Sequence, residues 1–389
     1  MSQAISVSRQ VLVLGATPEA QRVACELHQL GYAVHWVSLD GGTIPQESPN
    51  STYPSPRSGV SLIAFEGQAG HFQATLQGDR EISLLPVAAA VIAVGNERYY
   101  PAERYGISLG PRVITVSQLL AQLDESSEKE TSLGNRVIVL LDWGGETPRE
   151  TATEALWAAS RARCEAGVEV YVFYENLKVD SPGLERQTRQ MRDQGILFCR
   201  YSEAKVSADE SHVMVSYMEG DIQGDLLVLP EAIRPHPATA NLAKVFDIRL
   251  GEDGLFQEIN VRQYRPGLSS RRGVFVAGRC HMDASLEEAQ EDALQAAANV
   301  DALLGTGVIE TEEIIAHVDA AKCIRCLTCV RTCPHTAIGI ADYEDVVAAR
   351  VMDFACYGCG ACVANCPVQA IALVGESPEI SPAPAWMTV

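Results

Sequence analysis

Alternating apolar runs and amphipathic segments predict an α/β fold for the first part of the chain. Residues 11–14 are apolar and lead into a tight turn, after which apolar positions recur with a helical period over residues 20–30. Residues 34–37 form a second apolar run, so this order predicts a βαβ unit. A hairpin around residues 66–70 and a buried strand over residues 87–95 are expected next.

The same alternation of strand and helix returns in the middle of the chain. Apolar strands are predicted at residues 137–141 and 168–173. The helix between them begins at Thr147-Pro-Arg-Glu150, which has the form of a capping box with Pro at the first helical position. The polar run 124–135 is predicted to be a linker. Further helices and strands of this part are expected at residues 182–194, 196–201, 213–218 and 225–230.

A third apolar segment, Gly273-Val-Phe-Val-Ala-Gly278, is followed by Arg279 and by a helix rich in alanine over residues 289–298. A strand that ends in Ala-Gly and an alanine-rich helix can pack close to a sheet, because small side chains allow close approach. We therefore expect this segment to return the chain to the first βαβ unit.

Eight of the twelve cysteines lie in two copies of one motif near the end of the chain. Each copy reads C-x2-C-x2-C-x3-C-P, the spacing that holds [4Fe–4S] clusters in bacterial two-cluster ferredoxins, where the fourth cysteine of a copy ligates the other cluster. Structural zinc would use pairs of cysteines, and disulfides would need an oxidising compartment. We therefore predict two clusters, cluster one on Cys323, Cys326, Cys329 and Cys366, and cluster two on Cys356, Cys359, Cys362 and Cys333.

The charge of the chain limits its partners. Acidic residues outnumber basic ones by 50 to 30, which gives a formal net charge of -20 and argues against binding to nucleic acid or to an anionic membrane. The first residues show no signal-peptide pattern, and no apolar run has the length of a membrane span. The scattered positions of the other cysteines are typical of a reducing compartment, so a cytoplasmic location is expected.

The turn at Gly15 only partly fits the dinucleotide-binding fingerprint G-x-G-x-x-G/A. Gly15 and the permitted final alanine are present, but Thr17 stands where a second glycine would let a pyrophosphate approach the backbone. Glu19 adds a negative charge that would repel phosphate. Ser38 takes the place of the ribose-binding acid, for which Asp40 could substitute.

The second set of α/β units carries no glycine fingerprint. The turn after residue 141 reads Asp142-Trp-Gly-Gly-Glu146 and offers no glycine-lined cradle for phosphate, so binding of NAD(P) is not predicted here. Asp142 and Glu146 are interpreted as a pair of carboxylates at a helix start, with a functional role as the alternative. Cys280, His281 and His335 are interpreted as ordinary structural residues.

Taken in order, these segments resemble the A subunit of heterodisulfide reductase and its relatives in other electron-transfer complexes. The resemblance rests on Gly15 and its turn, Glu66-Gly-Gln-Ala-Gly-His-Phe72, Val91-Ile-Ala-Val-Gly95, the Gly273–Gly278 segment and the duplicated cysteine motif. It implies a thioredoxin-reductase-like FAD-type Rossmann domain with an inserted NAD-domain-like α/β domain, followed by a C-terminal α+β bacterial-type 2[4Fe–4S] ferredoxin domain. The implied boundaries are 1–135 and 251–308 for the FAD-type domain, 136–250 for the insert, 309–376 for the ferredoxin domain and 377–389 for an extended tail.

The same resemblance implies a function. It describes an electron-transfer subunit of a cytoplasmic multi-subunit oxidoreductase, which passes electrons between a flavin and partner iron–sulfur or flavin subunits, with flavin-based electron bifurcation as the finer expectation. Two alternatives stay open: a structural subunit whose flavin site has decayed, and a stand-alone NAD(P)H:ferredoxin-type reductase. The cofactors implied are two [4Fe–4S] clusters and FAD, with FAD contacts expected at Gly15, Ala16, Thr17, Gly95, Gly278 and Arg279.

Overall fold

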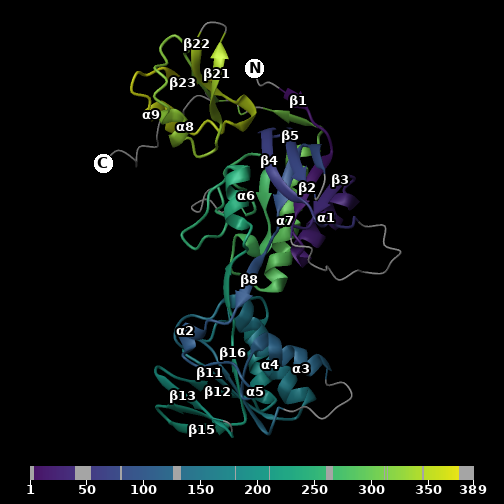
Figure 1. Cartoon of the computed structure of the whole chain (residues 1–389), viewed down its shortest axis with the longest axis vertical. Helices are drawn as coiled ribbons and strands as arrows, with labels where there is room; N and C mark the ends of the chain where they lie inside the picture. Colours follow the sequence, from purple (N-terminus) through teal and green to yellow (C-terminus); the bar gives the residue numbers. More distant parts are fainter. Residues whose placement is uncertain are drawn as a thin grey trace, which may run out of the picture. The chain divides into compact units, whose positions relative to one another are not determined.

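The fold is taken from a computed structural model of the chain (Figure 1). The residues that the structure describes are 4–39, 54–78, 81–125, 133–179, 181–209, 211–259, 266–310, 312, 314–343 and 346–375. Asp40, the tail 377–389 and most of the polar run 124–135 lie outside these ranges. Backbone contacts divide the chain into two compact units. Unit 1 comprises Met1–Gly95, Pro235–Met282 and Ala289–Val389, and unit 2 comprises Asn96–Arg234 and Asp283–Glu288.

The first part of unit 1 is built on a parallel sheet with the strand order β18-β7-β2-β3. Strands β2, β7 and β18 are buried along almost their whole length, as expected for a parallel sheet covered on both faces, whereas the edge strand β3 is buried only at its end. Helix α1 (Pro18–Gln29) contacts β2 and β3. The alanine-rich helix α7 (Leu286–Leu304) buries its small side chains in the same core. The strand bounds are β2 (Gln10–Leu14), β3 (Ala33–Val37), β7 (Ala89–Ile92) and β18 (Val274–Val276).

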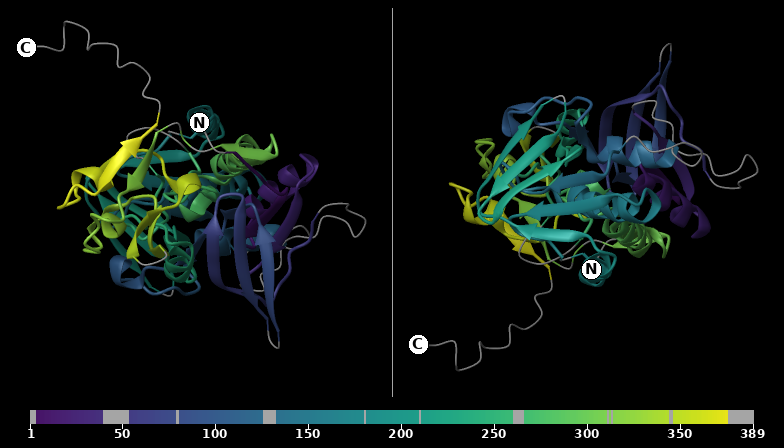
Figure 2. Two further views of the ribbon diagram at one scale, coloured as in Figure 1. Left: turned by 90° about the horizontal axis from the view of Figure 1, so that it is seen from above. Right: turned by 90° about the horizontal axis from the view of Figure 1, so that it is seen from below.

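Unit 1 also contains an antiparallel sheet of three strands (Figure 2). The predicted hairpin is present as β4 (Ser61–Gln68) and β5 (His71–Gln77), and β6 (Ile82–Val87) adds a third strand. Helix α6 (Thr239–Phe246) packs on β4 and buries Phe246 against Phe65, with ring centroids 4.6 Å apart. Strand β1 (Ala4–Ser6) pairs with β19 (Val308–Glu310).

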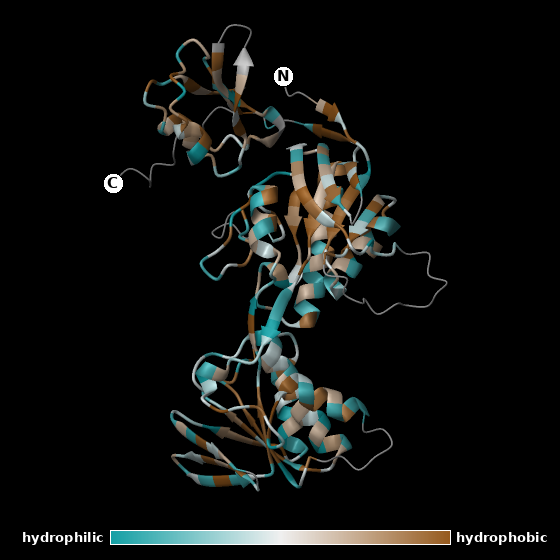
Figure 3. Cartoon of the chain, in the orientation of Figure 1, coloured by the Kyte–Doolittle hydropathy of each residue, from teal (hydrophilic) through white to brown (hydrophobic). Residues whose placement is uncertain are grey.

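Unit 2 contains a second parallel sheet, with the order β12-β11-β10-β16-β9. Hydrophobic residues follow the strands of both parallel sheets, while the helices carry polar residues on their outer faces (Figure 3). The strands are β9 (Val113–Thr115), β10 (Arg136–Leu140), β11 (Glu169–Tyr174), β12 (Leu197–Arg200) and β16 (Leu226–Leu229). The helices are α2 (Ala102–Tyr105), α3 (Val116–Glu125), α4 (Arg149–Glu165) and α5 (Leu184–Asp193).

Two small sheets complete unit 2. The antiparallel strands β13 (Ala204–Ala208), β14 (Val213–Tyr217) and β15 (Gly220–Gly224) form one of them. The other pairs β8 (Asn96–Tyr99) with β17 (Ala232–Pro235). Strands β8 and β17 lie next to the points where the chain passes from one unit to the other.

The limits of unit 2 differ from those expected of the insert, residues 136–250. Strand β9 pairs with β16, and α3 packs on α4, so the polar run after α3 lies within one unit instead of separating two. At the other end, α6 buries Leu242 and Phe246 in the core of unit 1. The polar run 124–135 is therefore a connection inside unit 2 and not a boundary between units. The sequence did not reveal this, because the three-residue strand β9 before the run carries too little periodicity to be recognised.

The last part of unit 1 is a small domain with its own core. Strand β20 (Ile315–Val318) pairs antiparallel with β23 (Ile371–Val374), and β21 (Ile338–Tyr343) pairs with β22 (Val346–Val351). Two short helices, α8 (Thr328–Thr332) and α9 (Ala361–Ala364), each contain the third cysteine of one motif copy (Figure 1). The core includes Cys329, Cys356 and Cys362. No helix within the described ranges is long and apolar enough to cross a membrane.

Candidate functional site

One cavity of the small domain gathers four cysteines from both copies of the motif. It is lined by Cys323, Cys326, Cys329 and Cys366, together with apolar residues that include Ile340 and Ile371. The first three cysteines lie before and on α8, and Cys366 follows α9. These are the four residues that the sequence assigned to cluster one.

A second cavity gathers the other four cysteines. Cys356, Cys359 and Cys362 come from the second copy, and Cys333 comes from the end of the first. The structure thus brings together the set that the sequence assigned to cluster two. Within the described ranges, no three His, Cys, Asp or Glu side chains lie close enough together to hold a single metal ion. The cysteines line the walls of the two cavities in two sets of four.

Backbone N–H groups point at the sulfur atoms in both halves of this domain. Ala337 donates to Cys333 Sγ at 3.3 Å, and Ala370 donates to Cys366 Sγ at 3.2 Å, each from four residues further along the chain. Cys356 Sγ accepts from Ala316 and Gly358, both at 3.4 Å. Hydrogen bonds to cysteine sulfur are one of the means by which a protein sets the reduction potential of an iron–sulfur cluster.

The two copies differ at the residues before and after their second cysteine. Gly358 and Gly360 have positive φ angles of 61° and 74°, and a Cβ atom on Gly358 would lie 2.3 Å from the carbonyl oxygen of Ile314. The matching residues of the first copy are Arg325 and Leu327, whose φ angles are 56° and 61°. Side chains other than glycine disfavour this region by about 1–2 kcal/mol per residue. The first copy therefore carries a conformational cost that the second avoids.

Residues next to the second cavity contact the FAD-type part of unit 1. His335 stacks on Tyr357 with ring centroids 4.6 Å apart, and the guanidinium of Arg272 lies 5.9 Å from the centroid of the Tyr357 ring. Thr336 donates a hydrogen bond to the carbonyl oxygen of Asp247 at 3.1 Å. Burial lowers the pKa of His335. His335 is thus a buried contact residue on the cluster-two side of the small domain.

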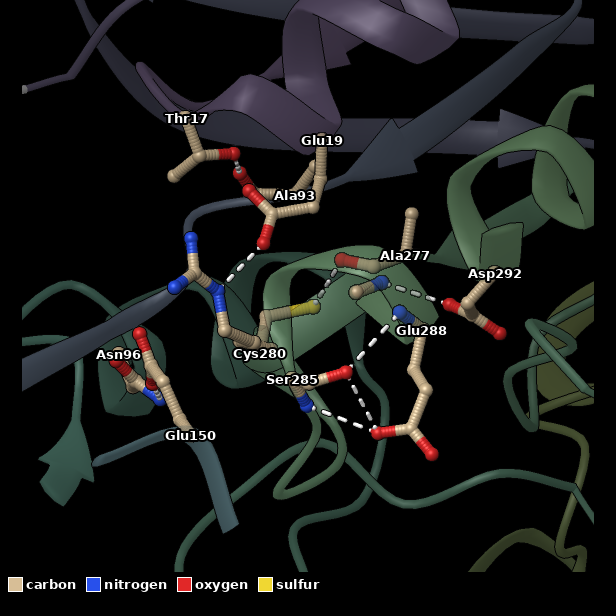
Figure 4. Close-up of polar contacts among 12 residues, drawn as sticks. Thr17, Glu19, Ala93, Asn96, Glu150, Ala277, Cys280, Ser285, Glu288 and Asp292 are labelled. Atoms are coloured by element: carbon tan, nitrogen blue, oxygen red, sulfur yellow. Dashed lines mark hydrogen bonds and ion pairs between the residues drawn. The ribbon is translucent and has the colours of Figure 1, made fainter. Parts of the chain in front are cut away.

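The turn between β2 and α1 explains two of the expected cofactor contacts. Gly15 has φ 135°, and a Cβ atom there would lie 2.0 Å from the carbonyl oxygen of Ala93, so only glycine fits. Thr17 caps α1 by accepting the N–H of Ala20 at 3.1 Å, and its hydroxyl donates to the Ala93 oxygen at 2.8 Å (Figure 4). Its methyl group also closes the space beside Gly95, because a Cβ atom on Gly95 would lie 3.0 Å from Thr17 Cγ2. Thr17, which the fingerprint treats as a departure, joins the helix to the sheet.

A buried ion pair stands at the start of α1. Glu19 is 1% exposed, and its Oε1 atom lies 2.5 Å from Nε of Arg279 (Figure 4). The carboxylate packs against the Gly278 turn, since a Cβ atom on Gly278 would lie 2.5 Å from Glu19 Cγ. The negative charge expected to repel phosphate is therefore neutralised by Arg279. The second oxygen, Oε2, is buried without a hydrogen-bond partner among the described residues, as is Ser38 Oγ at the end of β3.

A histidine beside this turn has buried charged neighbours that the sequence did not reveal. Nε2 of His281 lies 2.8 Å from Asp292 Oδ2, and Nδ1 lies 3.7 Å from Glu258 Oε1. Asp292 also accepts the N–H of Gly278 at 2.7 Å. His281 lines an open cavity of about 850 Å³ together with Glu258. Asp292 lies 11 residues after His281 and Glu258 lies before it on another segment, so no ligand or triad spacing signalled the cluster.

Cys280, in contrast, is a buried structural residue. It is fully buried, and its Sγ atom lies 3.2 Å from the carbonyl oxygen of Ile92. The same sulfur lies 3.3 Å from the carbonyl oxygen of Ala277 (Figure 4). Burial raises the pKa of its thiol. A thiol of this kind is a poor nucleophile at neutral pH, because the thiolate is the reactive form.

In unit 2, carboxylates surround the start of α4. Asp283 accepts hydrogen bonds from the N–H groups of Arg149 at 2.8 Å and Glu150 at 3.4 Å. Asp142, with φ 60°, accepts the N–H of Thr147 at 3.0 Å. The predicted capping box is wrong: the helix begins after Pro148 without a side-chain cap, and Glu150 pairs with Arg98 instead of reaching back to its own helix start. The helix N-terminus is occupied by Asp283, which lies far away in the sequence.

Comparison with known proteins shows what these features resemble. Residues 316–373 match the family described as 4Fe-4S dicluster domain. The A subunit of the ferredoxin:CoB-CoM heterodisulfide reductase of Methanosarcina mazei is 28% identical over 340 residues, which are 78% of this chain and 41% of that protein. The second iron–sulfur A subunit of the CoB--CoM heterodisulfide reductase of Methanopyrus kandleri is 26% identical over 286 residues, 66% of this chain and 43% of that protein.

The fold of a solved structure is also similar. Thioredoxin reductase of T. acidophilum matches with a TM-score of 0.50 and 14% identity, over 76% of this chain and 99% of that chain. This likeness confirms the thioredoxin-reductase-like fold expected from the sequence. The chain spans about two fifths of the length of the two curated relatives named above. With the dicluster domain and these relatives, the resemblance stated from the sequence is confirmed: the chain is similar to the A subunits of heterodisulfide reductases.

Proposed function

We propose that this chain is an electron-transfer subunit in which two [4Fe–4S] clusters connect a flavin site with partner redox proteins. The observation that carries this proposal is the sorting of the eight motif cysteines into two cavities, each lined by three cysteines of one copy and the fourth of the other. Each cluster carries one electron at a time. The proposed ligands are Cys323, Cys326, Cys329 and Cys366 for cluster one, and Cys356, Cys359, Cys362 and Cys333 for cluster two.

The test of the ligand assignment is the substitution Cys366→Ala. It should damage the cluster held by Cys323, Cys326 and Cys329 and leave the other intact, so iron content falls to about half and one of two EPR signals is lost. Cys164→Ala, which removes an exposed cysteine of unit 2, is the matched control. Loss of the cluster beside Cys356 instead would show that each copy of the motif holds its own cluster.

We further propose that FAD binds where the Gly15 turn, Gly95 and the Gly278 turn lie next to one another. The fit is supported by buried polar atoms without partners among the described residues, Ser38 Oγ at the end of β3 and Glu19 Oε2 at the start of α1. FAD would supply exchange of electron pairs. Gly15, Ala16, Thr17, Gly95, Gly278 and Arg279 are the proposed contacts, with the Arg279 guanidinium as the positive group for the pyrophosphate.

A second candidate function is that of a subunit whose flavin site has decayed, with only the clusters redox-active. The observation in its favour is the Glu19–Arg279 ion pair, which places a carboxylate at the helix N-terminus where an anionic cofactor would bind. Acid extraction of protein purified without oxygen distinguishes the two. Release of FAD at about one per chain supports the flavoprotein, and flavin-free protein with both clusters intact supports the decayed site.

The proposal extends to the assembly. We propose that the chain acts in the cytoplasm within a complex of further iron–sulfur or flavin subunits. None of its twelve cysteines, all of which are described, forms a disulfide. The name of a relative from Methanococcus maripaludis includes both a heterodisulfide and ferredoxin. Division of electron pairs between two acceptors is therefore the finer proposal, and native purification that retains other redox subunits is its first test.

A further inference from the structure

We propose that His281 is a positioning residue of the flavin site, which acts through Asp292 and makes the binding of FAD depend on pH. The inference rests on the proposed function, because Gly278 is one of the proposed FAD contacts. His281 is not among those contacts and reaches the cofactor site only through Asp292. The group that changes is one proton on the imidazole ring, which is exchanged with solvent.

Gly278 stands between two buried carboxylates that come from different helices. A Cβ atom on Gly278 would lie 2.5 Å from Cγ of Glu19, so the Glu19 side chain packs directly on the glycine. The N–H of Gly278 in turn donates to Asp292 Oδ2 at 2.7 Å (Figure 4). Glu19 belongs to α1 and Asp292 to α7, and their side chains are 1% and 6% exposed. Two carboxylates are therefore held beside the turn at which an anionic cofactor is proposed to bind.

Each of these carboxylates has a cation, and both cations come from the residues that follow Gly278. Arg279 pairs with Glu19 at 2.5 Å, and His281 places its Nε2 atom 2.8 Å from Asp292 Oδ2. A guanidinium is not deprotonated in proteins, whereas histidine is the side chain whose charge changes between about pH 5 and 8. The first pair is therefore always neutral, and the second is neutral only while His281 carries its second proton.

The other carboxylates that face His281 lie on the segment before it. Its Nδ1 atom lies 3.7 Å from Glu258 Oε1, and Glu252 and Asp253 line the same open cavity. The charged ring can donate from both nitrogens, whereas the neutral ring donates from one. The thiol of Cys280 does not add to the change of charge, because burial raises its pKa and it stays protonated. His281 is thus the group of this turn that titrates near neutral pH.

The charge beside the flavin turn is therefore set by one proton. With the proton on His281, the pair with Asp292 is neutral, and without it the buried carboxylate adds one uncompensated negative charge next to Gly278. The hydrogen bond from Gly278 remains in both states, because Asp292 stays an acceptor. Loss of the proton should thus weaken FAD binding without unfolding the turn. By linkage, the binding of FAD should draw a proton into the protein.

The experiment titrates FAD into the full chain, with both clusters loaded and the flavin removed, and follows the quenching of flavin fluorescence. Kd is measured at about pH 6 and about pH 8.5, at constant ionic strength, for wild type and three variants. His281→Asn keeps a donor for Asp292 but carries no charge. Asp292→Asn keeps an oxygen for the N–H of Gly278 and removes the negative charge. His71→Asn, which changes an exposed histidine on β5, is the matched control.

Wild type and His71→Asn should bind FAD about threefold to fivefold more weakly at the higher pH, and the difference should shrink as salt is added. His281→Asn should bind FAD at both pH values as weakly as wild type does at the higher pH. Asp292→Asn should bind FAD at the higher pH at least as tightly as wild type does at the lower pH. Loss of a merely structural contact would weaken binding instead.

Calorimetry in two buffers of different ionisation enthalpy should show uptake of protons when FAD binds to wild type near neutral pH, and none for His281→Asn. The role of His281 is overturned if wild type has the same Kd at both pH values, or if His281→Asn keeps the pH dependence. Weaker binding by Asp292→Asn than by wild type at the higher pH would also overturn it. If His281→Asn does not fold, His281→Gln gives the same comparison. Wild type that binds no FAD at either pH would refute the proposed flavin site itself, and this role with it.

Discussion

Replacement of Glu19 by Gln should make the chain bind FAD more tightly and, at the same time, fold less stably. Glu19 and Arg279 form a pair at the start of α1 in which the side chains are 1% and 12% exposed. The pair places about zero net charge where the pyrophosphate is proposed to lie. Glu19→Gln removes the negative member, keeps an oxygen that can accept from Arg279 Nε, and leaves one positive charge for the cofactor.

The size of the effect follows from Coulomb's law. Two unit charges about 6 Å apart at an effective dielectric constant of about 20 interact by roughly 3 kcal/mol. Because a phosphate group at the mouth of a crevice is partly screened by water and salt, we expect about half of this, or about 1.4 kcal/mol, which is about tenfold in Kd. The ion pair itself is lost, so the free energy of unfolding should fall by about 1–2 kcal/mol.

Both quantities can be measured on flavin-free protein. FAD affinity is obtained from the quenching of flavin fluorescence, and stability from chemical denaturation followed by circular dichroism. Arg279→Gln should lower both affinity and stability, since it leaves the buried Glu19 carboxylate unpaired. Glu26→Gln, seven residues further along α1, is the matched control and should change the affinity little. If Glu19→Gln binds FAD no more tightly than wild type, the carboxylate does not stand at the anion position and the reasoning fails.

Three further predictions concern other parts of the chain. Gly358→Ala should destabilise the small domain and reduce cluster loading, because its Cβ would lie 2.3 Å from the Ile314 oxygen. Leu327→Gly should raise the melting temperature, because glycine relieves the positive φ angle at this position. Iron counts and thermal melts check both predictions. Burial lowers the pKa of His35, so the unfolded chain binds the proton more readily and stability should fall as pH drops through about 6.5. Thermal melts at pH 7.5 and 5.5 should show this loss of stability in wild type and a smaller loss in His35→Leu. The control is His28→Leu, which changes an exposed histidine. The isolated chain should not oxidise NADH at a significant rate. Asp283→Ala should lower the free energy of unfolding by about 1 kcal/mol without creating this activity. Robust NADH:viologen turnover by wild type would contradict the occupied α4 N-terminus.

The sequence predicted those features whose determinants are local or duplicated. The cysteine spacing predicted which four residues line each cavity, because short loops and a repeated motif leave few arrangements of the ligands. The strands of both parallel sheets were recognisable as short apolar runs. Strand β9 was not, since three residues between turns have no measurable period, and its membership of unit 2 depends on pairing with β16.

Contacts between distant residues could not be predicted. Glu19 was interpreted as a charge that repels phosphate, because nothing in the sequence indicated that Arg279 would neutralise it. Thr147 was interpreted as a helix cap, yet the groups at the start of α4 are satisfied by Asp283, from a segment more than a hundred residues later. His281 was interpreted as ordinary for the same reason. In each case the decisive partner is a charged side chain supplied by the tertiary fold.

Both Rossmann-type sheets have a carboxylate of the chain at a helix N-terminus, but the carboxylate is held differently in each. In each, the helix that follows the first central strand begins with N–H groups that attract an anion, and in each the chain places a carboxylate of its own there: Glu19 in unit 1 and Asp283 in unit 2. The carboxylate of Glu19 is held by a guanidinium, which can turn its hydrogen bonds to an incoming phosphate. That of Asp283 is held by the N–H groups of Arg149 and Glu150, so a phosphate would have to displace it from these donors. The first arrangement lowers the affinity for a nucleotide but keeps the means to bind it, whereas the second closes the site. This difference is why we propose FAD for unit 1 and expect no nicotinamide chemistry in unit 2.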